Sequence, residues 1–130
     1  MSDDEKFTIP EELEEWIGLK KSEYLSVLIE NQPQEDFGFD EFHLFDHLIP
    51  DTVEGPDRSF EDKVDGRLLQ TFIRTYSDDR MYYHVVLGSP FADEKAGIEA
   101  FLLVLSFVTR SEEVVKKFST GQARARPTMN

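Results

Sequence analysis

The alternation of apolar and polar residues is clearest in the middle of the chain. Residues 67–76 (RLLQTFIRTY) alternate with a period of two and are rich in β-branched and aromatic side chains, as a β-strand requires. Residues 77–79 (SDD) have the composition of a turn, and residues 80–87 alternate again. The pattern predicts an antiparallel hairpin over 67–87, which ends at the Gly-Ser-Pro sequence of residues 88–90.

The apolar run of residues 97–109 fits two different elements. As a strand, it extends the hairpin to a three-stranded meander. As a helix, it places Ile98, Phe101 and Leu105 at helical spacing, behind acidic residues that suit the start of a helix dipole. Because its remaining positions are also apolar, either element must be buried on nearly all sides. The residue types leave both alternatives open and favour the strand marginally.

Helical spacing marks the N-terminal segment 8–31. Thr8 stands three residues before a glutamate, as in a capping box, and the glutamates that follow face away from the apolar stripe. Gly18 and Ser22 leave two alternatives, namely one kinked helix or two short helices, of which the second begins at Ser22. The apolar stripe consists of Leu13, Trp16, Ile17, Tyr24, Leu25, Leu28 and Ile29.

A short helix is predicted over residues 111–118, near the C-terminus. Ser111 has the chemistry of an N-cap, acidic residues follow it, and two lysines suit the C-terminal end of the helix dipole. Gly121 marks the expected stop. Residues 119–130 are predicted to form a basic tail, and residues 1–7 an acidic tail at the other end of the chain.

Residues 33–65 are the least regular part of the chain, and we expect an irregular acidic segment there. Within it, DEFHLFDHLIP has near-helical apolar spacing with Asp40 as the candidate N-cap and Pro50 as the terminator, although some positions alternate as in a short strand. Residues 50–65 are rich in turn formers, as in a long loop or a loosely paired edge strand. Loops of that length are often functional, so the segment is a candidate contact surface.

These patterns predict a single α+β domain. An antiparallel sheet of three to five strands, centred on residues 67–108, is flanked by an N-terminal helical segment and a C-terminal helix. A chain of 130 residues is large enough for one hydrophobic core and too small for two. The absence of cysteine excludes disulfides, thiolate catalysis and cysteine-based metal sites.

The net charge of −13 is concentrated in the first half of the chain. Residues 1–65 carry 20 acidic and 5 basic side chains, whereas residues 66–130 carry 7 and 9. An acidic surface repels nucleic acid and attracts basic molecules, so we predict a basic protein partner and no nucleic acid. No apolar run is long enough for membrane insertion, and the acidic N-terminus lacks the features of a signal peptide, which together predict a cytoplasmic protein.

Histidines are the weak candidates for catalysis. His43 and His47 are four residues apart, which on an α-helix places both imidazoles on one face, as in a two-histidine metal site, but no third ligand is identifiable. His84 lies within the predicted hairpin, where a histidine is more often a packing residue, and the sequence specifies no carboxylate beside it. We therefore predict no catalytic residue, no metal site and no cofactor.

Aromatic residues outside the predicted elements favour either a distributed core or an interaction surface. Together with the charge, they predict a non-catalytic protein-interaction module, that is, a chaperone-like protein, an adaptor or a component of a larger assembly. The alternative is a phosphoryl-accepting regulatory domain or small enzyme that uses His47 or His43. The predicted partner-binding residues are Phe42, Phe45, Glu41, Asp46, Asp51 and Glu54.

Two resemblances bear on these alternatives, and neither assigns the chain to a family. YYHVVLGSP and the later TRSEEVVKKF, in a stretch of roughly a quarter of the chain, resemble the late strands and helices of phosphotransferase-system A-domains, which accept a phosphoryl group on a histidine. Only HLIP at residues 47–50 is comparable with the surroundings of that histidine, and the flanking glycines are missing. The size, acidity and order of elements are similar to those of type III secretion chaperones, which implies a protein partner and a homodimer.

Overall fold

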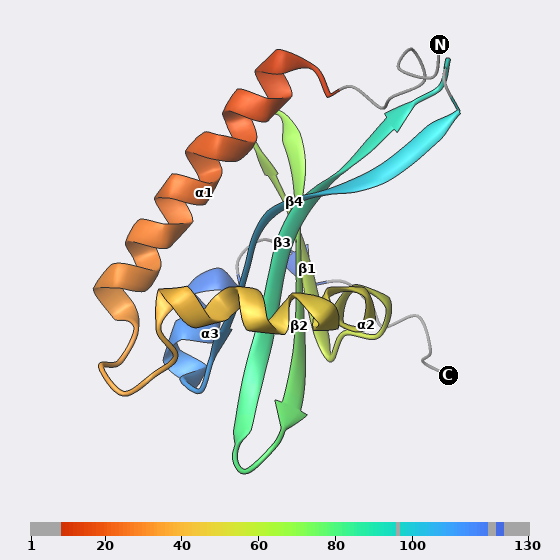
Figure 1. The fold of residues 1–130 in the computed structure, drawn as a ribbon. Helices are drawn as coiled ribbons and strands as arrows, with labels where there is room; N and C mark the ends of the chain where they lie inside the picture. The colour runs from red at the N-terminus through yellow and green to blue at the C-terminus, as the bar shows by residue number, and fades with distance from the viewer. Residues whose placement is uncertain (1–8, 96, 120–121, 124–130) are drawn as a thin grey trace.

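The fold is built on an antiparallel sheet with an N-terminal and a C-terminal helix, which confirms the predicted α+β class (Figure 1). The computed structural model describes residues 9–95, 97–119 and 122–123. The strand order in the sheet is β4-β3-β2-β1-β5, and each neighbouring pair is antiparallel. The strands are β1 (Arg58–Val64), β2 (Arg67–Ser77), β3 (Met81–Asp93), β4 (Ile98–Thr109) and β5 (Gln122–Ala123).

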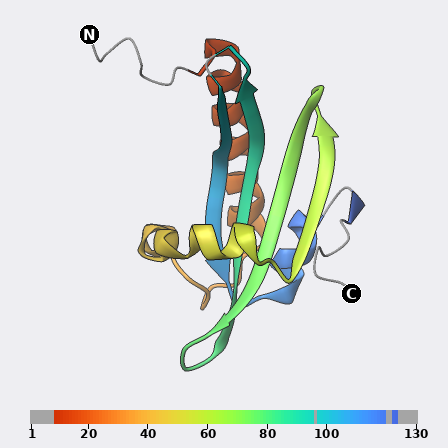
Figure 2. The same ribbon diagram turned by 90° about the vertical axis from the view of Figure 1, so that its right-hand side faces the viewer.

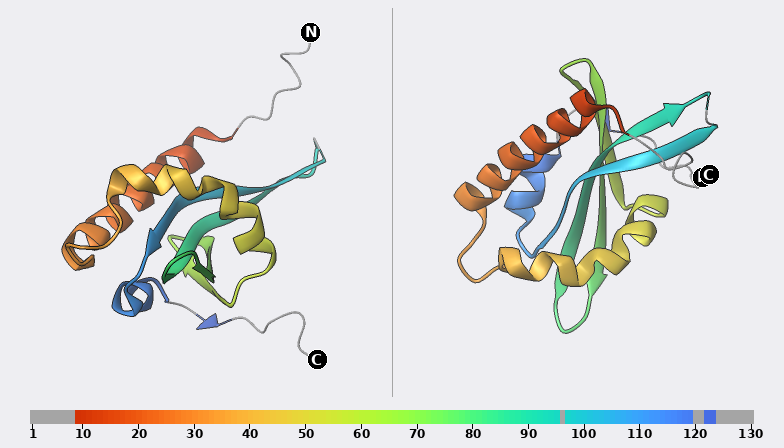
Figure 3. Two further views of the ribbon diagram at one scale, coloured as in Figure 1. Left: turned by 60° about the horizontal axis from the view of Figure 1, so that its bottom comes forward. Right: turned by 45° about the horizontal axis from the view of Figure 1, so that its top comes forward.

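The predicted hairpin is confirmed, but its second strand is longer than expected. β2 pairs with β3 as far as Gln70 opposite Gly88, and β3 then continues through Pro90 to Asp93 with β4 as its partner. The prediction that the strand ends at residues 88–90 is wrong, because the pairing of β3 with β4 continues through Pro90 to Asp93 opposite Ile98. β3 and β4 therefore project as a two-stranded arm beyond β2 and β1 (Figure 3).

Within residues 97–109, Ile98–Thr109 form a strand rather than a helix, so the marginally favoured alternative is confirmed. The helix α1 (Glu11–Asn31) and the 3₁₀ helix η2 (Phe39–Leu48) both pack against β4, α1 from behind and η2 from the front in the view of Figure 2. Together with β3 they bury most of its apolar side chains. Leu103 is 43 % exposed, so the expectation of burial on nearly all sides is wrong at this position.

The ladder between β3 and β4 is irregular beside Gly88. The register shifts between Leu87 and Gly88, and Val104 is the extra residue on β4, as in a β-bulge. The ring of Phe101 approaches the backbone of Gly88 so closely that a Cβ atom there would lie 2.3 Å from Phe101 Cζ and 2.7 Å from the carbonyl oxygen of Leu102. A side chain at this position therefore has no room.

Replacing Gly88 with alanine should destabilise the protein, because the added methyl group overlaps Phe101 and backbone. Overpacking of this kind costs about 1–3 kcal/mol, measurable by urea unfolding followed through the fluorescence of Trp16. Gly18→Ala is the matched control: nothing lies within 4 Å of a Cβ atom there, and the substitution should stabilise α1 by about 0.5–1 kcal/mol. Equal effects of the two substitutions would contradict the close approach at Gly88.

α1 is one uninterrupted helix, which decides between the two alternatives for the N-terminal segment. Gly18 and Ser22 are exposed positions inside it, so neither marks a helix end. Burial of the apolar stripe outweighs the small conformational cost of one glycine. The helix has Pro10 as its N-cap residue, and Thr8, the predicted cap, lies outside the described residues.

A polar cluster fastens α1 to the turn between β1 and β2. Trp16 Nε1 donates a hydrogen bond to Asp65 Oδ2 (3.1 Å), and Lys20 Nζ lies 3.1 Å from Glu23 Oε1 and 3.2 Å from Asp65 Oδ2. The hydrogen bond to Glu23 raises the pKa of Lys20 above the usual lysine value, and the bond from Trp16 lowers the pKa of Asp65. The 8 % exposed Lys20 is therefore a paired lysine.

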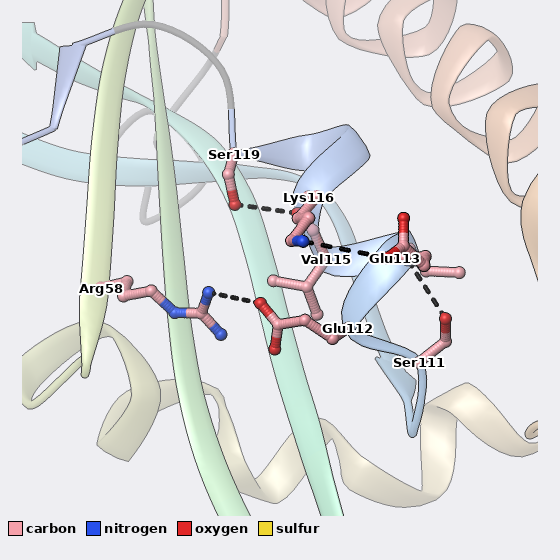
Figure 4. A network of polar contacts seen from close by, with 8 residues as sticks. Arg58, Ser111, Glu112, Glu113, Val115, Lys116 and Ser119 are labelled. Atoms are coloured by element: carbon pink, nitrogen blue, oxygen red, sulfur yellow. Dashed lines mark hydrogen bonds and ion pairs between the residues drawn. The ribbon is translucent and has the colours of Figure 1, made fainter.

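The C-terminal helix forms as predicted, as α3 (Glu112–Phe118). Ser111 Oγ accepts a hydrogen bond of 3.2 Å from a backbone N–H of the first turn. An ion pair joins the helix to β1, with Arg58 Nη1 2.9 Å from Glu112 Oε2 (Figure 4), and this arginine lowers the pKa of Glu112. Gly121, the expected stop, lies outside the described residues.

The segment 33–65 is ordered, so its description as irregular is wrong. It contains η2, the helix α2 (Ile49–Glu54) and β1, which pairs with β2 along its whole length. Pro50 does not terminate a helix but lies in the first turn of α2, where its missing N–H is not needed. Long-range contacts supply the order: Asp36, for example, accepts hydrogen bonds from the Thr109 hydroxyl and the following N–H at the end of β4.

η2 begins after Gly38, not at Asp40 as predicted. Glu41 Oε1 accepts a hydrogen bond from the backbone N–H of Gly38 (2.8 Å), so a glutamate in the first turn caps the helix. A 3₁₀ helix of 10 residues is long for its type, and such helices have weak internal hydrogen bonds. Burial of Phe42 against the sheet therefore holds η2 in place.

Candidate functional site: a groove at the edge of the sheet

A groove of about 360 Å³ lies between α1, η2 and the outer edge of β4. β4 is the last strand in the sheet order, and four consecutive residues of it, 103–106, line the groove. Because side chains alternate between the faces of a sheet, a groove that meets four consecutive residues lies along the edge of the strand. We name it the edge groove. Its lining residues are Lys21, Leu25, Phe39, Phe42, His43, Asp46, Leu103, Val104, Leu105 and Ser106.

Two exposed apolar side chains, Phe39 and Leu103, lie in the edge groove, with exposed fractions of 39 % and 43 %. The ring of Phe39 stacks on that of Phe42 with centroids 5.2 Å apart. Phe42 in turn packs against the fully buried Phe107, at 6.0 Å. The exposed ring is therefore supported from below by the hydrophobic core.

The two helices that frame the edge groove are acidic. α1 and η2, which frame it, carry nine acidic residues and two lysines between them. Of the lysines, Lys20 is paired with Glu23 and Asp65, and Lys21 lines the groove. Asp46 also lines it, and in the described part of the chain no salt bridge involves an acidic residue of η2. A basic side chain that enters the groove therefore meets a carboxylate available for pairing.

The edge groove brings together three residues that the sequence singles out, Phe42, His43 and Asp46. Phe42 is only 7 % exposed, so it supports the groove from the core and is not itself available to a partner. Phe45 is half-buried, with its ring 5.4 Å from that of Tyr82. The other predicted partner-binding residues are exposed and lie outside the lining: Glu41, Asp51 and Glu54.

The aromatic residues outside the predicted elements belong mainly to the core, which favours the distributed-core alternative for them. Phe42 is one of the buried core residues. Four others are partly buried and pack against that core: Phe37, Phe45, Phe60 and Phe91. Their number therefore does not by itself indicate an interaction surface.

His84 is a buried structural residue. Its Nδ1 lies 2.7 Å from Thr52 Oγ1 and its Nε2 lies 2.9 Å from Ser106 Oγ, and the side chain is fully buried. Thr52 Oγ1 is also 2.9 Å from the hydroxyl of Tyr76. This chain of hydrogen bonds ties α2 to β2, β3 and β4, and it occupies both ring nitrogens.

The electrostatics of His84 agree with a structural role. Burial lowers its pKa to about 4, and the nearby charge of His47 acts in the same direction. The ring is therefore neutral at pH 7. A general base must come within hydrogen-bonding distance of the proton that it removes, and a fully buried ring with two occupied nitrogens does not.

His43 and His47 are exposed and do not share a helix face. They lie on a 3₁₀ helix, in which residues four apart differ by about 120° in direction, against about 40° in an α-helix. The expectation of a shared face is therefore wrong for this type of helix. Across the described ranges, no group of three or more histidine, cysteine, aspartate or glutamate residues is placed to hold a metal ion.

Sequence reasoning missed seven of the ten residues that line the edge groove, which are Lys21, Leu25, Phe39, Leu103, Val104, Leu105 and Ser106. Leu103 belongs to an apolar run that has the pattern of a buried strand. Whether such a strand lies at the centre or at the edge of a sheet depends on strand order, which local periodicity does not record.

No protein-family model, curated protein or solved structure matches this chain. Over the residues that the structure describes, no helix combines the length and the apolar character needed to cross a membrane. The function is therefore inferred from the geometry and chemistry of the edge groove.

Proposed function

We propose that the protein is a non-catalytic protein-interaction module that binds a basic partner segment in the edge groove, as a chaperone-like protein, an adaptor or a component of a larger assembly. The observation that carries this is the pair of exposed apolar side chains, Phe39 and Leu103, between two acidic helices. Exposed apolar surface with a polar rim is typical of sites at which soluble proteins bind other molecules.

Charge favours a basic partner over an acidic one. The net charge is −13, and both helices that frame the groove belong to the acidic first half of the chain. Long-range attraction speeds the encounter with a basic partner and makes binding dependent on salt. Apolar contacts in the groove then supply affinity, because buried apolar side chains near the centre of an interface contribute most of its binding energy.

Selection of random peptides displayed on phage, with the full chain as bait, tests this function. We expect the enriched peptides to carry a net positive charge and at least one large apolar residue. Leu103→Ser should weaken the binding of synthetic versions about tenfold or more, because it removes a leucine side chain that the complex would bury. Isothermal titration calorimetry at two salt concentrations measures this, with weaker binding expected at the higher salt.

Leu19→Ser is the matched control, because Leu19 is 64 % exposed on α1 and does not line the edge groove. It should leave the affinity unchanged. Asp46→Asn should reduce both the affinity and its dependence on salt. Enriched peptides without net positive charge, or equal losses in the two leucine variants, would contradict the proposed function.

A further inference from the structure

We infer that the partner segment binds as an additional β-strand, hydrogen-bonded to the outer edge of β4. The inference rests on the proposed function and specifies the partner as an extended, basic segment of another protein. An edge strand presents a row of backbone N–H and C=O groups with which a further strand can pair. β4 is in that position, at the opposite side of the sheet from β5.

The two edges of the sheet differ in what covers them. β1 is joined by β5 at Phe60 and Glu61, so a segment of the chain itself pairs there. Within the described chain, β4 has β3 as its backbone partner, and no strand pairs with its other side. The edge that remains open to an incoming strand is therefore the one that lines the edge groove.

Residues 100–109 of β4 lack two features that commonly protect an edge strand from pairing. Proteins commonly place charged residues or proline on exposed edges. Residues 100–109 contain neither, and the charged residue of the strand is Glu99, near its start. The one irregularity is the bulge at Val104, which lies next to the exposed Leu103. Bulges recur beside functional sites, where they redirect a side chain.

The edge groove offers contacts for the side chains of an added strand. A strand laid along residues 103–106 directs its side chains alternately to one face of the sheet and to the other. Its apolar side chains would contact Leu25 on the side of α1, and the basic side chains on the other face would lie beside Phe39 and Asp46 of η2. A segment in which apolar and basic residues alternate therefore fits the groove.

Charge disfavours a second copy of this chain as the occupant. Two molecules of net charge −13 repel each other over the distances at which an encounter begins, whereas a basic segment is attracted. The partner is accordingly a different, basic protein.

Peptides that are blocked on one edge test strand addition. The probe is the peptide acetyl-KVKLKVK-amide. One modified version carries N-methyl groups on the backbone amides of the apolar residues, and a second carries them on the backbone amides of the lysines. Strand pairing uses the amides of alternate residues, so one N-methylated version should bind about tenfold or more weakly while the other matches the unmodified peptide. In the complex, alternate amides of residues 99–106 should exchange with solvent more slowly. The peptide with glutamate in place of lysine is the charge control and should not bind.

Strand addition would be overturned if the three basic peptides bound equally and the amides of β4 did not exchange more slowly with solvent. The groove would then recognise the side chains of its partner and not its backbone, and the proposed function would stand. Strand addition is also overturned if acetyl-KVKLKVK-amide does not bind while basic peptides selected on phage do. Failure of the selection itself would instead remove the proposed function. The free protein should sediment as a monomer, and a dimer that Leu103→Ser dissociates would show that a second copy occupies the edge, against the inference.

Discussion

Replacing Phe107 with alanine is expected to lower the free energy of unfolding by about 3–5 kcal/mol. Phe107 is fully buried on β4, and its ring centroid lies 6.0 Å from that of Phe42 and 4.8 Å from that of Phe118. The ring thus joins η2 and α3 to the sheet, and its removal leaves a cavity whose lining loses its contacts. Since domains of this size have a stability of about 5–15 kcal/mol, much of it would be lost.

Urea unfolding, followed by the fluorescence of Trp16, measures the effect of Phe107→Ala. Leu44→Ala on η2 is the control, because Leu44 is 59 % exposed and its truncation should change the stability by no more than about 0.5 kcal/mol. Phe107→Leu keeps part of the side-chain volume and should show a smaller loss, which makes the test independent of whether the alanine variant folds. Equal stabilities of the alanine variants would contradict the central position of Phe107.

Acidification from pH 6.5 to pH 4 should destabilise the protein through His84. Burial, and then the charge of His47, lowers the pKa of His84 to about 4 in the folded chain, against 6.5 in the unfolded chain. Between these values the unfolded chain binds a proton that the folded chain excludes, so stability is complete above pH 6.5 and falls as the pH decreases. The difference between the two pKa values corresponds to about 3 kcal/mol.

His84→Asn should remove this part of the pH dependence. Because the variant also loses hydrogen bonds to Thr52 and Ser106, the quantity to compare is the change of unfolding free energy with pH, and not its absolute value. Urea unfolding of both proteins between pH 4 and pH 7 provides it. An NMR titration of the His84 ring in the unmodified protein gives an independent value, and a midpoint near 6.5 would contradict the buried, neutral imidazole.

Elements with local signals were predictable. The alternation over 67–87 yields the hairpin of β2 and β3, and Ser111 followed by acidic residues yields α3, because these patterns depend on neighbours in the sequence. The segment 33–65 was not predictable in the same way. Its order depends on contacts with distant residues, such as Thr52 with His84, and no local pattern records such contacts.

The edge groove was likewise predictable from the sequence only in part. Asp46 and His43 could be singled out as exposed polar residues of an acidic segment, whereas Leu103 could not. Its apolar neighbours give the strand the pattern of a buried element, and its exposure follows from the position of β4 at the edge. Phe42 is among the predicted partner-binding residues, but it is buried because it packs against Phe107, far along the chain.

The sequence by itself determined the α+β class, the central hairpin, the acidic first half of the chain and the absence of cysteine chemistry. Only the tertiary structure decided that Ile98–Thr109 form an edge strand, that His84 is buried, and that α1, η2 and β4 line one groove. The physical reason is that periodicity records which side of its own element a residue faces. Which strands pair, and which edge stays open, results from contacts between residues far apart in the chain.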